Sequence, residues 1–503
     1  MMKTYGIRAL ALFLGMLMLL GAAVACGKTE DPAQDPTAVT TTAANGESAT
    51  TTATEVVEEV EISRENYPDS LPEDLKFEGK TFNFMVRGDS ERRDEYIADQ
   101  ITGEIINDAT FAREATVEDR FGIDLVWVEV PHSDVVTTVR ASLNSGLMDF
   151  DLLASETDHI VTLGAEGFFM NWIDAPYIDF EKPWWNPKSN MVENLSINGK
   201  LYGITGDISR LFVQKHFVCY FNKEIMANYP TIPNLYDLVL EGKWTIEKMT
   251  EYGALVKEDL NGNQKMDIQD RYGFASYYAT PFDNWIIALG QRTITKNAEG
   301  VPEFRMDDPD MVDLCELLTE IYRSDTTCLA PGNRAETTKF FAEGHCLFTV
   351  GGFEWASGMR DMTNDFGMIP YPMLNEDQDG YYTGYSDVGA SCVAIAAIHP
   401  DKEFACAVTE ALAAESYRKV TTAYFETALK EKYSRDSQSS QMLDMIREGI
   451  VFDFGFYYGS QLDNPDTIMR SAVSGGKNNY VSLYKSLSKI YNKRMSDLLA
   501  KYQ

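Results

Sequence analysis

The sequence predicts an α/β layered fold with a largely parallel sheet. Short runs rich in β-branched and aromatic residues occur at Lys80–Val86, Ile123–Val130 and Phe150–Ala154. Longer runs with apolar residues at helical spacing separate them, at Thr102–Phe121 and Val135–Leu143. Strands that alternate with helices are typical of this class, because the helices connect parallel neighbours and cover the sheet. With 503 residues, the chain is long enough for two or more domains.

The first 26 residues have the parts of a secretory signal. Lys3 and Arg8 form a basic head, an apolar run follows, and small residues precede Cys26. A cysteine directly after Ala23-Val24-Ala25 resembles a bacterial lipobox, in which the thiol is lipidated and the peptide before it is removed. We therefore expect a signal peptide over residues 1–25, a lipid on Cys26, and a chain anchored on the extracellular face of the cell membrane. A single transmembrane anchor is the alternative.

Residues 26–70 predict a tether rather than a domain. The stretch is dominated by Thr, Ala, Glu, Asp and Pro and has few large apolar side chains. Such a composition buries too little apolar surface to offset chain entropy, so we expect disorder up to the start of the folded part near Leu71.

Charge and cysteine usage exclude several classes of protein. The formal net charge is -33, with 77 acidic against 44 basic residues, which argues against binding nucleic acid or an anionic membrane surface. The cysteines beyond Cys26 form no CxxC pair and no metal-type spacing with histidine. Most lie in apolar surroundings, so we expect buried free thiols; they are Cys219, Cys315, Cys328, Cys346, Cys392 and Cys406.

The second half of the chain predicts further strands and helices. Apolar runs of strand length are Phe217–Asn222, Cys346–Val350, Phe366–Pro370 and Ser391–Ala397. Helical spacing marks Trp244–Glu258, Pro309–Ser324, Lys402–Glu415 and Asn479–Tyr502. Thr245 is the expected N-cap of the first of these helices, and residues 436–503 are expected to form a helical segment that packs on the rest.

An Asp/Asn-rich stretch follows the helix at Trp244–Glu258. Its oxygen donors fall at positions 1, 3, 5, 7, 9 and 12 of an EF-hand-type loop: Asp259, Asn261, Asn263, the Lys265 carbonyl, Asp267 and Asp270. Gln264 stands where such loops carry Gly, and Asp270 replaces the usual Glu. We expect a structural Ca²⁺ in loop 259–270 and no catalytic cofactor. An ordinary surface turn is the alternative.

Several motifs in this order resemble those of the extracellular solute-binding proteins of ABC transporters, family 1, the maltose-binding-like group. They are DFDLLASETDHIVTLGAEGFF, NGKLYGITGD, YFNKEIM, DLNGNQKMDIQDRYGF, FFAEGHCLFTVGGFEW and SCVAIAAIHPDKEFA, and the similarity spans about residues 80–430. The resemblance implies two α/β lobes of the type II periplasmic-binding-protein fold, joined by crossing hinge strands and closing on a ligand.

The resemblance also implies domain bounds and partners. Lobe 1 is expected over 71–205, completed by about 390–435, and lobe 2 over 206–389, with hinges near Ile204–Ser209 and Val388–Val393. We expect a monomeric receptor that hands a small solute to the permease of an ABC transporter.

The residues of the expected site suit an oligosaccharide. Sugars present apolar C–H faces and a rim of hydroxyls, so their sites combine aromatic rings with carboxylates and amides. Such side chains fall in expected loops at strand ends or crossings: Asp158, Asp207, Asp283, Trp285, Glu354, Trp355, Tyr385 and Asp387. Trp184 and Trp185 suit either the site or the core.

Two other functions stay open at this point. The sequence has no nucleophile elbow, HExxH, P-loop or GxGxxG, so we expect no enzyme, but a secreted hydrolase with paired carboxylates is an alternative among 77 acidic residues. A purely structural or adhesive surface protein is a third reading. A receptor is distinguished from both by saturable binding of an intact solute.

Overall fold

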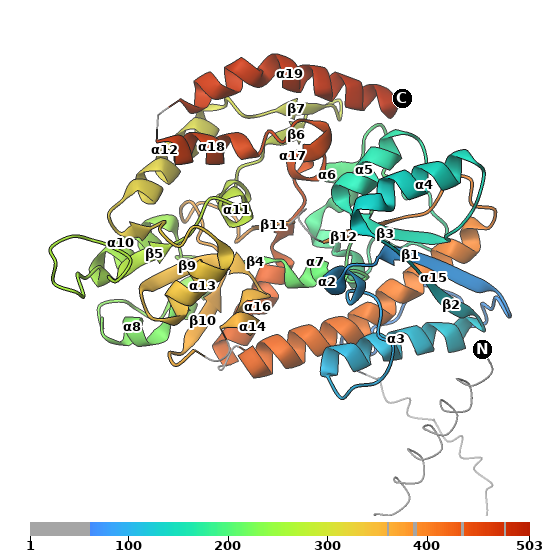
Figure 1. The fold of residues 1–503 in the computed structure, drawn as a ribbon, viewed down its shortest axis with the longest axis horizontal. Coiled ribbons are helices and arrows are strands. Elements are labelled where there is room, and N and C mark those ends of the chain that lie inside the picture. The colour runs from blue at the N-terminus through green and yellow to red at the C-terminus, as the bar shows by residue number, and fades with distance from the viewer. Residues whose placement is uncertain (1–60, 360–361, 386–389, 434–436, 477–478) are drawn as a thin grey trace, which may run out of the picture. The chain divides into compact units, whose positions relative to one another are not determined.

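The computed structural model describes residues 61–359, 362–385, 390–433, 437–476 and 479–503, which belong to one compact unit, Glu61–Gln503 (Figure 1). The predicted signal peptide, Cys26 and most of the tether lie outside these residues. Across the described part, none of the helices combines the length and apolarity needed to cross a bilayer.

The first sheet has the parallel strands that the sequence predicts. Its order is β12 (Ser391–Ala394), β3 (Leu152–Glu156), β1 (Thr81–Arg87) and β2 (Asp124–Val130). Strand β1 runs parallel to β2 and to β3, whereas β12 is antiparallel to β3. The helices of this lobe are α2 (Ser90–Arg93), α3 (Ile105–Phe121), α4 (Val135–Asn144), α5 (Thr157–Ala165) and α15 (Lys402–Glu415). The α/β class is confirmed.

A second sheet forms from the middle of the chain. Its order is β10 (Phe366–Ile369), β4 (Phe217–Asn222), β9 (Cys346–Gly352), β5 (Tyr272–Ala275) and β8 (Thr327–Cys328). Strand β5 is parallel to β8 and β9, and β4 is antiparallel to β9 and β10. The protein therefore has two lobes, each built on its own sheet (Figure 1).

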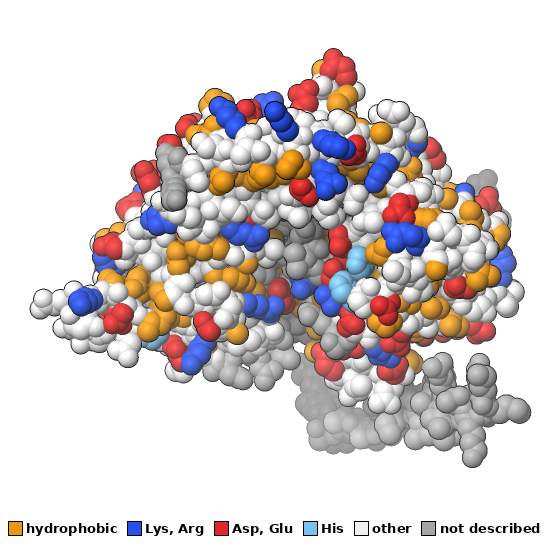
Figure 2. All heavy atoms as spheres, turned by 45° about the horizontal axis from the view of Figure 1, so that its top comes forward, with side chains coloured by type: hydrophobic (Ala, Val, Ile, Leu, Met, Phe, Trp, Pro, Cys, Tyr) orange, Lys and Arg blue, Asp and Glu red, His pale blue; other side chains and the backbone are white. Residues whose placement is uncertain are grey.

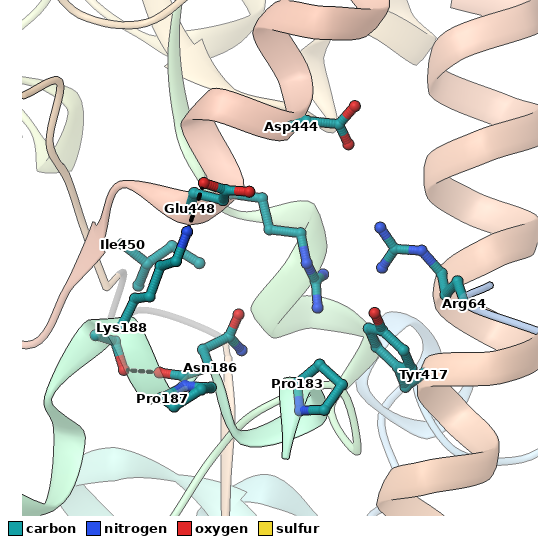
Figure 3. A pocket seen from close by; sticks show the side chains of 11 residues that line it. Arg64, Pro183, Asn186, Pro187, Lys188, Tyr417, Asp444, Glu448 and Ile450 are labelled. Carbon is teal, nitrogen blue, oxygen red and sulfur yellow. Dashed lines mark hydrogen bonds and ion pairs between the residues drawn. The ribbon is translucent and has the colours of Figure 1, made fainter. Parts of the chain in front are cut away.

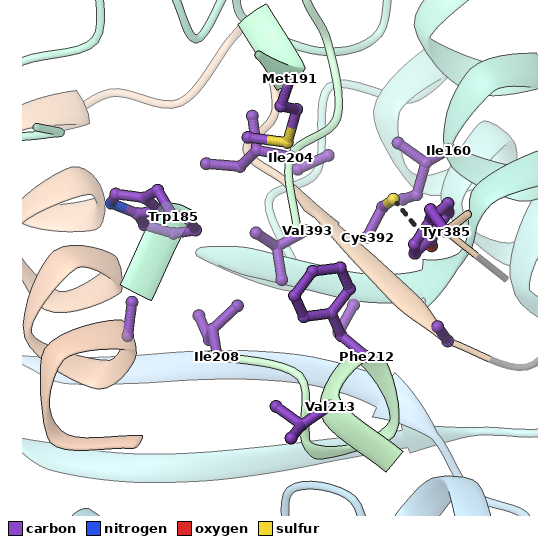
Figure 4. Packing of buried hydrophobic residues seen from close by; sticks show 14 of the residues in the cluster. Ile160, Trp185, Met191, Ile204, Ile208, Phe212, Val213, Tyr385, Cys392 and Val393 are labelled. Atoms are coloured by element: carbon purple, nitrogen blue, oxygen red, sulfur yellow. Dashed lines mark hydrogen bonds between the residues drawn. The ribbon is translucent and has the colours of Figure 1, made fainter. Parts of the chain in front are cut away.

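The two segments expected to cross between the lobes lie side by side. The backbone N–H of Ile204 donates to the Val393 carbonyl, with 3.2 Å between N and O, and the N–H of Val393 donates to the Ile204 carbonyl at 2.8 Å. Apolar side chains surround this pair, including Ile208, Phe212 and Cys392 (Figure 4). After Ile208 the first crossing continues as the short helix α7 (Arg210–Gln214) into β4. The crossings are thus built into the hydrophobic core rather than exposed.

Helices dominate the end of the chain, as predicted. The π-helix η4 (Ser416–Tyr433) leads to α16 (Ser437–Glu448), α17 (Phe454–Tyr457), α18 (Thr467–Gly475) and α19 (Tyr480–Lys501). Helix α16 packs against β10 and α9 (Leu235–Leu240). Helix α19 packs against α12 (Pro309–Arg323) and α18 (Figure 1). Strand β13 (Ile450–Val451) pairs with β11 (Thr383–Gly384), so this segment is tied to the second crossing.

The remaining elements connect these layers. Helices are α6 (Met191–Leu195), α8 (Lys223–Ala227), α9 (Leu235–Leu240), α10 (Ile246–Val256), α11 (Thr280–Ala288), α12 (Pro309–Arg323), α13 (Arg334–Ala342) and α14 (Trp355–Gly358). Two short strands, β6 (Ile294–Lys296) and β7 (Pro302–Phe304), pair with each other, and the 3₁₀ turns are η1 (His132–Asp134), η2 (Pro183–Trp185), η3 (Pro187–Ser189) and η5 (Gly459–Gln461).

Local signals explain several of these bounds. The Thr245 side chain accepts a hydrogen bond from the Lys248 N–H, which confirms the predicted N-cap of α10. Helix α3 ends at Gly122, whose φ of 69° closes the helix in the left-handed conformation that glycine adopts without strain. The strand predicted to reach Ala397 instead ends at Ala394. Six cysteines of the described part are buried and free, as expected.

Candidate functional site

The carboxyl ends of β1, β2 and β3 meet at one edge of the first sheet, which we call the first edge. Ligands in α/β proteins bind beyond such ends. Glu156, the last residue of β3, lies there with 16% of its side chain exposed. Its Oε1 accepts hydrogen bonds from Arg87 Nη1 at 2.8 Å and from Arg92 Nη2 at 3.1 Å. Two guanidinium groups thus hold this carboxylate in place.

Two histidines lie beside Glu156 at the first edge. The rings of His132 and His159 are 4.9 Å apart at 30°, and His132 Nε2 is 3.7 Å from Glu156 Oε2. His159 Nδ1 is 2.8 Å from Ser155 Oγ, and burial lowers the pKa of His159. Figure 2 shows histidine side chains gathered beside a hollow in the face that it presents. A neutral imidazole can both donate and accept a hydrogen bond, which suits the hydroxyl groups of a ligand.

Asp158 is exposed at the same edge, in the first turn of α5 rather than in a loop. One of its carboxylate oxygens accepts the His159 N–H at 2.8 Å, which leaves the other side of the carboxylate open to solvent. Its position follows β3 directly, as the sequence predicts. The two histidines were missed by sequence reasoning: His159 lies within the motif DFDLLASETDHIVTLGAEGFF but was not singled out, and His132 lies outside the motifs.

A buried polar network connects the first edge to both crossings. Glu95, which is fully buried, accepts hydrogen bonds from Ser391 Oγ at 2.7 Å and from Ser209 Oγ. Arg87 Nη2 donates to Ser391 Oγ at 2.7 Å and lies 3.5 Å from the Glu95 carboxylate. Since Ser209 and Ser391 belong to the two crossings, Arg87 joins both of them to Glu156.

The second sheet presents aromatic rings at the carboxyl ends of β5 and β9, which we call the second edge. Trp355 follows β9 and Tyr277 follows β5; their rings are nearly parallel at 15°, with centroids 6.2 Å apart. The ring of Tyr220 is also nearly parallel to that of Trp355, with an angle of 5° between the planes and centroids 6.5 Å apart. Tyr277 is half-buried, whereas Trp355 is only 3% exposed. Tyr277, which sequence reasoning missed, is therefore the more accessible ring.

Two glycines make room for this arrangement. A Cβ on Gly351 would lie 2.2 Å from Trp355 Cδ2, and one on Gly352 would lie 2.0 Å from Glu354 Oε2. Real Cβ atoms do not approach other atoms so closely, so position 351 needs glycine beside the packed Trp355 ring, whereas a Cβ at position 352 would displace the flexible end of the Glu354 side chain. Glu354 also pairs with Arg334 Nη1 at 3.2 Å. The Gly351-Gly352 pair thus sets the position of a ring and of a carboxylate at the second edge.

Asp207, expected to bind ligand at the first crossing, is buried. Arg447 Nη2 donates to both of its carboxylate oxygens, at 2.5 and 2.7 Å. Arg447 is itself only 8% exposed and lines a cavity of about 260 Å³ together with Arg64, Lys188 and Tyr417 (Figure 3). Asp207 is therefore engaged by an internal cation rather than presented at either edge.

Asp283 and Trp285 belong to α11 and not to a loop, which corrects the expectation. Asp283 pairs with Arg470 Nη1 at 2.9 Å, and Trp285, with no exposed surface, donates its indole N–H to Tyr322 at 3.0 Å. The helix begins at Thr280 and turns both side chains into the core of the second lobe. Neither residue is brought to the edges.

Tyr385 joins the crossing rather than facing solvent. Its hydroxyl is 2.8 Å from Thr157 Oγ1, and its ring lies 5.1 Å from that of Phe452. Asp387 lies outside the described residues. Trp184 and Trp185 belong to the core, where both indoles donate to Glu410, at 3.0 and 2.8 Å. Burial raises the Glu410 pKa to about 8.

Loop 259–270 has the turn that an EF-hand-type loop requires. Asp259 accepts hydrogen bonds from the backbone N–H groups of Gly262 and Gln264, both at 2.7 Å. Gln264 adopts a φ of 60°, the left-handed conformation for which such loops use Gly. Asp270 accepts the Leu260 and Asp267 N–H groups, and is fully buried. The donors are hard oxygens of the kind that Ca²⁺ prefers.

Other metal sites of the described residues can be assessed from side-chain clusters. In residues 61–503, apart from the gaps stated above, no group of three or more His, Cys, Asp or Glu side chains has a metal-binding arrangement. The loop's own set relies on Asn amides and a backbone carbonyl as well as carboxylates. Its donor chemistry fits Ca²⁺, and it remains a prediction.

Comparisons with known proteins agree with this architecture. The profile of a family described as bacterial extracellular solute-binding protein matches residues 112–423. A cyclo/maltodextrin-binding protein complexed with maltotetraose has a TM-score of 0.54 at 10% identity, covering 85% of this chain and 98% of its own. An extracellular solute-binding protein from Staphylococcus aureus, in complex with maltose, has a TM-score of 0.54 at 12% identity, covering 84% and 98%.

No curated protein sequence matches the chain. The likeness to the two solved structures shows the shared two-lobe fold, and the family profile covers more than half of the chain. Its family is one of binding proteins rather than enzymes, as the absence of catalytic motifs led us to expect. The chain belongs to the bacterial extracellular solute-binding proteins.

Proposed function

We propose that this protein is the receptor of an ABC transporter that captures an oligosaccharide between the first and second edges and delivers it to the permease. One observation carries the proposal. At the carboxyl ends of two sheets joined by crossings, one edge offers a carboxylate with imidazoles and the other offers aromatic rings. This is the pair of surfaces that a sugar needs.

Each edge contributes a different part of the recognition. Glu156, Asp158 and the two histidines of the first edge accept or donate hydrogen bonds to hydroxyl groups. At the second edge Tyr277 offers a half-buried ring to the apolar C–H face of a pyranose. A ligand that contacts both edges only when the lobes are shut favours the shut state by those extra contacts.

The ligands of related structures support a saccharide. Maltotetraose and maltose occupy the two solved proteins that share this fold. The cations at the edges also have carboxylate partners: Arg87 and Arg92 contact Glu156, and Arg334 contacts Glu354. An anionic ligand would compete with these carboxylates, so the arrangement favours a neutral sugar.

A thermal-shift titration with neutral malto-oligosaccharides tests the proposal, with chromatography of the sugar afterwards. Ligand at 100 times its Kd should add about 2.7 kcal/mol to the free energy of unfolding. Saturable stabilisation with the sugar recovered intact supports a receptor. Shortened sugar would indicate the hydrolase, and no saturable response to any saccharide in the series would contradict the assignment.

The membrane attachment is a further part of the proposal. A lipid on Cys26, followed by the tether, would hold the folded unit near the permease at the outer face of the membrane. Mass spectrometry of the protein from its native membrane should find a lipidated N-terminal Cys26. Release of a Cys26→Ser variant into the medium is expected, and a variant that stays membrane-bound would indicate a transmembrane anchor instead.

We also propose that loop 259–270 binds Ca²⁺ as a structural ion. The six predicted donors would hold it, and its role there is to brace the loop between α10 and β5. Added CaCl₂ should raise the melting temperature of EDTA-treated protein, and Asp259→Ala should abolish the rise while Asp377→Ala leaves it. An equal rise in both variants would show binding elsewhere.

A further inference from the structure

Arg334 lies over the aromatic ring that the second edge holds in place. Its guanidinium carbon is 5.9 Å from the centroid of the Trp355 ring, and its Nη1 is 3.2 Å from Glu354 Oε1. The side chain begins at the first residue of α13 and is 47% exposed, whereas Trp355 is 3% exposed. A long and partly exposed cation therefore lies against a ring that is itself almost fully buried.

The groups that hold Trp355 from within are fixed. The backbone at Gly351 lies so close that a Cβ there would be 2.2 Å from Trp355 Cδ2. Tyr220, whose ring is parallel to Trp355, is anchored by its hydroxyl donating to the Gly352 carbonyl at 2.7 Å. A strand backbone and an anchored ring do not move aside for a ligand. Arg334 does not share these constraints.

The contacts that hold Arg334 over the ring are weak. A cation over an aromatic ring and an ion pair, both at an exposed site, each change an equilibrium constant by roughly two- to fivefold. Arg334 also keeps Glu354 as a partner if its guanidinium turns away from the ring. Displacement of the guanidinium from Trp355 is therefore a small cost for a ligand that stacks in its place.

We propose that Arg334 is a removable cover over Trp355 and a specificity-determining residue of the second edge. A pyranose ring that stacks on Tyr277 and extends to Trp355 displaces the guanidinium, and only ligands with an apolar face of that size recover the loss. This inference rests on the proposed function for the ligand, but the cover itself is a property of the ligand-free protein. In this role Arg334 weakens ligand binding and donates no hydrogen bond to the ligand.

The cover is tested first without any ligand, by acrylamide quenching of tryptophan fluorescence. The contribution of Trp355 is the difference between each protein and its Trp355→Phe counterpart. Arg334→Ala should increase the quenching of Trp355 severalfold. Lys339→Ala, which removes another exposed cation of α13, should leave it unchanged. Equal shielding of Trp355 with and without Arg334 would overturn the proposal.

The effect on specificity is tested by calorimetry with maltotetraose. We expect Arg334→Ala to bind two- to fivefold more tightly than the unchanged protein, because only the contact of the cation with the ring is lost, and Lys339→Ala to bind with unchanged affinity. Weaker binding by Arg334→Ala would overturn the proposal, because Arg334 would then contact the sugar. If no protein of the series binds maltotetraose, the proposed function fails for this sugar, and the quenching result still decides whether Arg334 covers Trp355.

Discussion

The two edges of the site fix the positions of their binding groups in different ways. At the first edge a carboxylate is held by buried charges, since Glu156, Arg87 and Glu95 form one network that reaches both crossings. At the second edge the position of the Trp355 ring depends on the absence of a side chain at Gly351. Charge fixes the polar half of the site, and close packing fixes the aromatic half. The two halves should therefore fail in different ways.

The largest effect is expected at the first edge. Glu95→Ala removes a partner of Arg87, which is 1% exposed, and leaves Ser209 and Ser391 without their shared acceptor. Breaking a buried ion pair from one side costs about 3–5 kcal/mol. Urea unfolding should show this loss. Glu343→Ala, an exposed carboxylate on another lobe, should change stability by less than about 0.5 kcal/mol. Equal small losses would show that the network does not stabilise the fold.

The carboxyl of Glu410 is buried away from both edges, and its hydrogen-bond partners are neutral indoles rather than guanidinium groups. Glu410 faces two indole N–H groups and, with burial as the main cause, its pKa is raised to about 8. The folded state therefore keeps a proton that the unfolded state releases above its ordinary pKa of about 4.5. Stability contributed by this proton is complete below pH 4.5 and is lost as the pH rises through about 8.

The loss approaches about 1.4 kcal/mol per pH unit within that window. Urea unfolding between pH 5 and 8 should show a shallower decline for Glu410→Gln than for the unchanged protein, because the amide does not titrate. Parallel declines in the two proteins would show that Glu410 ionises normally in the folded state.

We expect added side-chain volume at Gly351 to disturb the packing of the second edge. Gly351→Ala places a methyl group against Trp355, and overpacking of this kind costs about 1–3 kcal/mol and moves the ring. Saccharide affinity should fall as well, as measured by calorimetry. Gly358→Ala is the matched control, because a Cβ there meets nothing within 4 Å. Unchanged affinity in Gly351→Ala would separate Trp355 from the binding site.

The smallest effect concerns the second lobe's loop. Gln264 has a φ of 60°, a conformation that costs a residue with a Cβ about 1 kcal/mol. Gln264→Gly should therefore stabilise the protein by about 0.5 kcal/mol, after the greater freedom of glycine in the unfolded chain is included. Gln269→Gly, in the same loop without a positive φ, should give no gain in thermal unfolding. A loss at position 264 would contradict the strained turn.

Much of the fold could be predicted from the sequence, because hydrophobic periodicity reports directly on strands and helices. The strand at Phe217–Asn222 and the Thr245 cap are confirmed to the residue. Asp158 was placed at a strand end for the same reason. Sequence patterns do not report which polar side chains find internal partners, so Asp207 and Asp283 could not be recognised as ion-paired with Arg447 and Arg470.

The aromatic half of the site was harder to predict. The sequence alone does not distinguish a tryptophan of the hydrophobic core from one that stacks on a sugar. Trp285 belongs to the core because helix α11 turns it toward Tyr322. Tyr277 and the paired histidines come from positions distant in sequence, and only the tertiary fold brings His132 next to His159. A glycine pair before an aromatic residue, as in Gly351-Gly352, is a signal that could have pointed to close packing.

Calorimetric titration of one neutral saccharide into the unchanged protein, Glu156→Gln and Tyr277→Ala tests the central claim most directly. The account predicts one saturable site with intact sugar recovered, and an affinity lowered at least tenfold by either substitution, since the ligand touches both edges. An affinity that either substitution leaves unchanged, or sugar that is cleaved during the titration, would contradict a receptor that binds its ligand between the two edges.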